Sequence, residues 1–114
     1  MNEEKELLGN VEEYMEQAEY AVSKSHINSA VTLYFKVIAV LVDLFLLKKE
    51  GFIPSNHKER FRILEIKYPL IYNILDKDFP IYQNSYRIKL DKQYAEVFKN
   101  DIKKIIEFTD IKIN

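Results

Sequence analysis

The sequence has no cysteine, only two histidines, two glycines and three prolines among 114 residues. Without cysteine the chain can form no disulfide, no thiol nucleophile and no thiolate metal site, and this absence is compatible with a reducing compartment. The residues after Met1 are Asn2, Glu3 and Glu4, which lack the basic region and apolar core of a signal peptide. We therefore expect a cytoplasmic protein that is not exported.

The two histidines do not form a recognisable metal or catalytic site. His26 and His57 are far apart in the chain, without the close spacing of a helical metal pair, so we predict no metal site. We expect His26 in a loop and His57 half-buried above Phe61 in the first turn of a helix. No glycine-rich phosphate loop and no Ser-His-Asp signature occurs, so the sequence predicts neither a common hydrolase nor a cofactor.

Charge is balanced overall but uneven along the chain. The 17 basic and 18 acidic side chains give a net charge of -1, which provides no global attraction for nucleic acid. Residues 1–20 carry seven Glu against the single Lys5. Residues 48–67 hold six basic and three acidic side chains, and residues 77–104 hold seven and four. Local basic patches are therefore compatible with the neutral average.

The longest apolar run extends from Ala30 to Leu47, where only Thr32, Lys36 and Asp43 are clearly polar. This length is about the minimum for crossing a bilayer, but each charged residue at the membrane centre costs about 2.5 to 3.5 kcal/mol. Thr32, Lys36 and Asp43 lie on one helix face, and a thin polar stripe on an apolar helix is typical of the centre of a soluble bundle. We therefore predict a buried central helix and no membrane span.

The other helices follow from apolar spacing and from end signals. Asn56 with Glu59 three residues later matches a capping box, and the residue before Pro69 is disfavoured in a helix. Whether Pro80 kinks a helix or begins the next one stays open. We predict helices over Glu3–Lys24, over Ser29–Leu47, from the Asn56 cap to the residue before Pro69, over Leu70–Asp76 and over Asp91–Thr109.

These elements indicate an all-α fold. Strands are hard to place because no two-residue hairpin signal separates alternating runs, and the length suits one core. We predict an antiparallel bundle of four to five helices with residues 1–114 in a single domain. The central helix has more apolar surface than so small a chain readily covers, so we hypothesise a homodimer.

The chain resembles the HEPN domains (higher eukaryotes and prokaryotes nucleotide-binding), which are small helical bundles of this size. The resemblance covers most of the chain and rests on loose patterns. These are Ala18, Glu19 and Ala21; Ser29 and Ala30; Leu33, Tyr34 and Phe35; Leu41, Val42, Asp43 and Leu44; Gly51; the run His57 to Phe61; and the segment from Tyr82 to Tyr94.

The resemblance implies a site in the last of these segments. Many HEPN domains are metal-independent ribonucleases with an Arg followed four to six residues later by a His at a dimer cleft, and some have a Tyr two residues after that His. The comparable residues here are Arg87, Lys92 and Tyr94. Lys92 stands where the family has histidine, and a lysine needs its pKa lowered by about three units to act as a base near neutral pH. It can still hold a phosphate as a point charge.

The same residues also have structural interpretations. Arg87 can pair with Asp91 four residues later, and Tyr94 begins the apolar face of the last helix. Tyr82 and Tyr86 can stack on bases or lie in the core. Three basic residues, Lys58, Arg60 and Arg62, can line a groove for RNA or a nucleotide, or can form ordinary surface pairs with neighbouring acids.

The sequence is compatible with three functions. The first is a non-catalytic or weakly active HEPN-like module that works with a partner, a small nucleotidyltransferase, in a toxin-antitoxin or RNA-linked system, with Tyr94 as the residue to which the partner transfers a nucleotide. The second is a HEPN-type ribonuclease that uses Arg87 with Lys92 or with a histidine from elsewhere in the fold. The third is a helical interaction scaffold without a nucleic-acid role.

Overall fold

The computed structural model of the chain describes residues 2–113, and within them it contains five α-helices and no strand. These are α1 (Asn2–Ser23), α2 (Ile27–Glu50), α3 (His57–Lys67), α4 (Pro69–Asn84) and α5 (Lys92–Thr109). The predicted all-α bundle is therefore confirmed.

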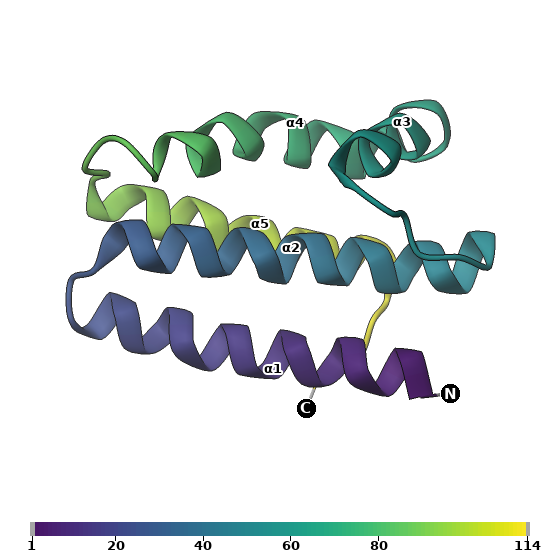
Figure 1. The fold of residues 1–114 in the computed structure, drawn as a ribbon, viewed down its shortest axis with the longest axis horizontal. Coiled ribbons are helices and arrows are strands. Elements are labelled where there is room, and N and C mark those ends of the chain that lie inside the picture. The colour runs from purple at the N-terminus through teal and green to yellow at the C-terminus, as the bar shows by residue number, and fades with distance from the viewer. Residues whose placement is uncertain (1, 114) are drawn as a thin grey trace.

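Helix α2 lies at the centre of the bundle (Figure 1), with α1 antiparallel along one side, α3 and α4 along the opposite side, and α5 running beside it. It supplies half of the twelve largest fully buried side chains, including Tyr34, Phe35 and Leu41. By length and hydropathy α2 also resembles a membrane-spanning helix, but 67% of its most apolar window is buried inside the bundle. Its apolar surface therefore forms the core of this fold.

The ends of α2 follow from local rules. Before α2 the chain reverses through Ser25, whose φ of 60° is left-handed, and the His26 N–H donates to the Ala21 carbonyl at 2.8 Å. After α2, Gly51 adopts a φ of 87° and its N–H donates to the Leu47 carbonyl at 3.0 Å. A residue without a Cβ takes this left-handed conformation without steric cost, so glycine ends the helix here.

The predicted cap of α3 is present. The Asn56 side-chain oxygen accepts a hydrogen bond from the Glu59 N–H at 2.9 Å. The Glu59 carboxylate reaches back to the N–H of Ser55 at 2.7 Å, one residue earlier than in a standard capping box. Leu64 of this helix is fully buried. The sequence predicts a His57 half-buried above Phe61, but this residue is exposed at the start of α3.

Helix α4 is longer than predicted. The expected short helix, Leu70–Asp76, is part of one continuous helix that includes Pro80. Pro80 lacks the N–H that would bond to the Asp76 carbonyl, and an interior proline costs about 3 kcal/mol. Buried Leu75 before the proline and half-buried Tyr82 after it pack on the same core. This packing on both sides explains why the helix continues.

Helix α5 packs against α2 and α4 and completes the bundle. Phe98, Ile102 and Ile105 are buried, as its apolar spacing predicts. After α5 the chain turns at Asp110, whose φ is 54°, and Ile111 is buried against the core. Figure 1 shows this last segment descending toward α1.

Candidate functional site

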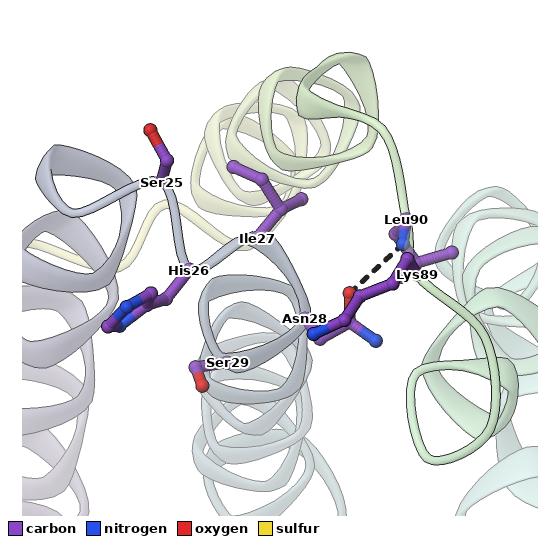
Figure 2. Close-up of a pocket in the computed structure, with 7 residues that line it drawn as sticks. All are labelled: Ser25, His26, Ile27, Asn28, Ser29, Lys89 and Leu90. Carbon is purple, nitrogen blue, oxygen red and sulfur yellow. Dashed lines mark hydrogen bonds between the residues drawn. The ribbon is translucent and has the colours of Figure 1, made fainter.

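The segment that the HEPN resemblance singles out forms a fixed turn between α4 and α5. We refer to residues 85–91 as the α4–α5 turn. The Asn28 side-chain amide, near the start of α2, donates to the carbonyls of Ser85 at 2.8 Å and Ile88 at 2.5 Å. Its oxygen accepts from the Leu90 N–H at 3.0 Å, as Figure 2 shows. One side chain of α2 thus satisfies three backbone groups of the turn, which sequence reasoning did not foresee.

A second polar residue of α2 supports the same turn. The Thr32 hydroxyl is 3.0 Å from the Ser85 hydroxyl, which in turn donates to the Tyr82 carbonyl at 2.6 Å. Asn28 and Thr32 are four residues apart and so lie on one face of the helix. The sequence signal for this contact was the presence of two polar residues at this spacing on an otherwise apolar helix. They indicate that another segment of the chain packs there with polar backbone groups.

Arg87 is exposed on this turn. The sequence allowed an ion pair with Asp91, but no carboxylate among residues 2–113 lies within 4.0 Å of its guanidinium. Together with Gln83, Asn84 and Tyr86 it lines a surface hollow of about 480 Å³. The guanidinium therefore keeps its hydrogen-bond donors available to a ligand.

Lys92 and Tyr94 lie differently from each other. Lys92 is the first residue of α5 and is exposed. Tyr94 is half-buried and packs against the core, as its position on the apolar face predicts. The Tyr94 N–H donates to the Asp91 carbonyl at 3.0 Å within the first turn of the helix. Of the three HEPN-like positions, Arg87 and Lys92 thus reach solvent more fully than Tyr94.

Tyr82 and Tyr86 form a pair that joins core to surface. The Tyr82 ring stacks on Phe35, with centroids 4.5 Å apart and planes 17° apart. Its hydroxyl is 3.0 Å from that of Tyr86. This hydrogen bond, with burial and the neighbouring phenol, raises the pKa of Tyr82 to about 12. Tyr86 is 70% exposed, so its ring is the aromatic surface that the site offers for stacking.

The three basic residues of α3 do not form one groove. Lys58 and Arg62 are exposed, but Arg60 is buried. The Arg60 guanidinium forms a bidentate ion pair with Asp43 of α2, with N–O distances of 2.6 and 2.8 Å. A lone carboxylate inside an apolar helix requires a cation, and Arg60 meets that requirement. Its predicted contact with RNA is therefore not compatible with its position.

The same guanidinium fixes the state of His57. Arg60 Nη1 lies 2.7 Å from His57 Nδ1, and arginine can only donate, so Nδ1 accepts and the neutral ring carries its proton on Nε2. Burial, the charges of Arg60 and, more weakly, Lys36 lower the pKa of His57, while Asp43 opposes them. The ring packs near Phe79, with centroids 5.2 Å apart. A histidine held neutral in this way is poorly suited to exchange protons with a substrate.

His26 is the histidine that the fold brings toward the α4–α5 turn. It lies in the α1–α2 turn and lines a hollow of about 260 Å³ together with Lys89 and Leu90. Figure 2 shows its imidazole directed away from the Lys89 side chain. Within the described part of the chain, no group of three or more His, Asp or Glu residues is placed to hold a metal ion.

Comparisons of the chain with protein-family models, with curated proteins and with solved structures find no match. No matched protein therefore indicates what the α4–α5 turn binds, and only its own geometry bears on its chemistry. The turn combines a guanidinium without a carboxylate partner among residues 2–113, an exposed phenol ring and two exposed lysines, Lys89 and Lys92.

The Asp43–Arg60 pair is expected to be essential for stability. Arg60→Ala leaves Asp43 buried without a cation and should lower the free energy of unfolding by about 3 to 5 kcal/mol. The matched control is Arg62→Ala on the exposed side of the same helix, which should change it by no more than about 0.5 kcal/mol. Urea unfolding followed by circular dichroism measures both. Equal effects of the two substitutions would refute the structural role of Arg60.

His57 is expected to titrate below the usual histidine range. The unfolded chain binds a proton near pH 6.5 that the folded chain resists, so this group's contribution to stability is present above about pH 6.5 and is lost as pH falls through the folded pKa. Long-range ¹H–¹⁵N spectra should show the Nε2–H tautomer for His57 at neutral pH. His26 provides the internal comparison. A His57 pKa at or above the usual histidine value would contradict the Arg60 contact.

Proposed function

We propose that this chain is a HEPN-like helical module that binds RNA or a nucleotide at the α4–α5 turn and has little or no cleavage activity of its own. The observation that carries the proposal is the exposure of Arg87, which has no carboxylate partner within residues 2–113 and lies on a turn whose backbone is held by Asn28. A fixed backbone reduces the conformational entropy lost when a ligand binds. Arginine at such a position suits phosphate, because its planar group donates two parallel hydrogen bonds.

The neighbours of Arg87 support the same ligand class. Tyr86 exposes its ring next to it, and stacking of a base on an aromatic ring contributes about 1 to 3 kcal/mol. Lys89 and Lys92 add positive charge within five residues of Arg87. Lysines near a phosphate chain strengthen binding without sequence preference.

The state and position of the histidines are the reason to expect little or no cleavage. In-line cleavage needs a group that exchanges protons near neutral pH. Lys92 occupies the family's histidine position, and His57 is held neutral by Arg60. The proposal therefore assigns binding, and not catalysis, to Arg87.

A ribonuclease is the second candidate, because His26 lies at the same end of the bundle as the α4–α5 turn. In that case His26 supplies the proton transfer and Arg87 stabilises the charge on the phosphate. The imidazole would have to turn from the direction seen in Figure 2 to approach a substrate at Lys89.

Binding to a labelled single-stranded RNA of about 12 nucleotides tests the proposal. Arg87→Ala should weaken binding about tenfold and reduce the slope of log K against log salt by about 0.7. Arg62→Ala is the control, since it removes the same charge from an exposed site on α3. Fluorescence anisotropy at several salt concentrations measures both variants.

The outcomes separate the candidates. Equal binding by the wild type and both variants would contradict the proposed site, and no RNA binding at all would favour a protein-interaction scaffold. Cleavage of the RNA that disappears in both Arg87→Ala and His26→Ala, with the fold intact, would establish the ribonuclease instead.

The partner protein is part of the same proposal. We propose that the chain acts as a homodimer with a small nucleotidyltransferase, for which the support is the HEPN resemblance alone. Affinity purification of the tagged protein from its host after nuclease treatment should recover such a partner. Mass spectrometry of the purified protein should then detect a nucleotide mass on Tyr94. Recovery of the chain alone, with unmodified Tyr94, would contradict this part.

A further inference from the structure

Two buried carboxyl groups, one on α4 and one on α5, lie beside the same lysine, Lys77. Asp78 of α4 is fully buried and Asp101 of α5 is 2% exposed. Asp78 precedes the α4–α5 turn and Asp101 follows it. Neither residue takes part in the proposed binding site. Sequence analysis assigned neither of them a role, since Asp78 lay beyond the predicted Leu70–Asp76 helix and Asp101 lay within the predicted last helix.

The cations around this pair are too few to neutralise both groups. Lys77 Nζ lies 2.8 Å from Asp101 Oδ2 and 3.5 Å from Asp78 Oδ1. Lys104 Nζ approaches Asp101 Oδ1 only to 4.0 Å and is largely exposed. Lys77 thus serves Asp101 first. The geometry leaves Asp78 with one distant, shared cation.

Hydrogen bonding shows the same imbalance. Neither Asp78 oxygen has a hydrogen-bond partner that is an N–H or a hydroxyl in the described chain. A buried ionised carboxylate without donors is strongly disfavoured. A protonated Asp78 avoids this cost, because a neutral carboxyl group needs no counter-charge and its O–H can donate to a neighbouring carboxylate.

The local charges act in the same direction. Burial, above all, together with the hydrogen bond to Asp101 and its charge, raises the pKa of Asp78 to about 8, and Lys77 only partly opposes this. For Lys77, burial works against the charged form, but the hydrogen bond and charges of the two carboxyl groups raise its pKa. The lysine therefore remains charged over the range in which the carboxyl pair titrates.

We infer that Asp78 and Asp101 share a single proton that fastens α4 to α5, and that loss of this proton in mildly alkaline solution loosens α4. The inference is independent of RNA binding. Pro80 lies two residues after Asp78 and leaves α4 without one backbone hydrogen bond there. The half of α4 that leads into the α4–α5 turn therefore relies on this side-chain contact.

The sign of the pH effect follows from the two states. The unfolded chain releases the Asp78 proton near pH 3.8, whereas the folded chain keeps it to about pH 8. The contribution to stability is therefore complete below the lower value and is lost as pH rises toward the higher one. The folding equilibrium constant should fall by up to about tenfold per pH unit in that window.

Asp78→Asn tests this directly, because its amide donates to Asp101 at every pH and so imitates the protonated state. Between about pH 5 and pH 8 the wild type should lose up to about tenfold in folding constant per pH unit relative to this variant. Asp76→Asn, an exposed position on the same helix, removes the same formal charge and should keep the wild-type slope. Urea unfolding at each pH measures all three proteins.

A second measurement reports the shared proton and the motion of α4. Side-chain ¹³C spectra of the wild type should show a carboxyl resonance of the pair titrating near pH 8. Amide exchange in α4, corrected for intrinsic rates, should increase relative to α1 above that pH. Identical slopes for wild type and Asp78→Asn, titration of both carboxyls below about pH 5, or unchanged α4 exchange would overturn the inference. If Asp78→Asn does not fold, the wild-type spectra and exchange still decide it.

Discussion

The ion pair between Asp43 and Arg60 is the interaction on which the arrangement of the bundle depends. Helix α2 is apolar on nearly every side, so apolar contact alone does not specify which helix packs where. Asp43 is a buried charge on that helix, and it is stabilised only where a guanidinium meets it with two hydrogen bonds. This requirement selects the position of α3, and α3 carries the chain into α4. The pair therefore contributes specificity as well as stability.

The polar residues near the start of α2 fix the position of the candidate site. Asn28 and Thr32 bind the backbone and the Ser85 hydroxyl of the α4–α5 turn through hydrogen bonds. Because these contacts use the turn's backbone and the Ser85 hydroxyl, the side chains of Arg87 and Tyr86 remain exposed. Asp43 at one end of this polar face of α2 and Asn28 at the other thus fix the two ends of the α3–α4 layer against the central helix.

Two ionisable groups that lack a dedicated counter-charge have shifted pKa values. Partial burial and the Arg60 guanidinium at its Nδ1 lower the pKa of His57. Burial beside Asp101 raises the pKa of Asp78 to about 8, and Lys77 lies closer to Asp101 than to Asp78. The lowered pKa of His57 opposes folding as pH falls below about 6.5, whereas the raised pKa of Asp78 opposes folding increasingly as pH rises from about 3.8 to about 8. The two effects therefore act in opposite directions where their ranges overlap. Both effects arise from one cause, which is that a buried ionised group needs a dedicated counter-charge.

The sequence by itself determined the helices, the cap of α3, the end of α2 at Gly51 and the core faces, because these depend on residues within four positions of one another. The HEPN resemblance singled out Arg87 and Lys92 as candidate site residues, and their role stays a prediction. Only the tertiary structure decided that Arg60 is buried, that Asn28 holds the turn, that α4 continues through Pro80 and that Asp78 meets Asp101. Each of these depends on a partner at least 17 residues away or on packing against another helix, and local spacing does not contain that information.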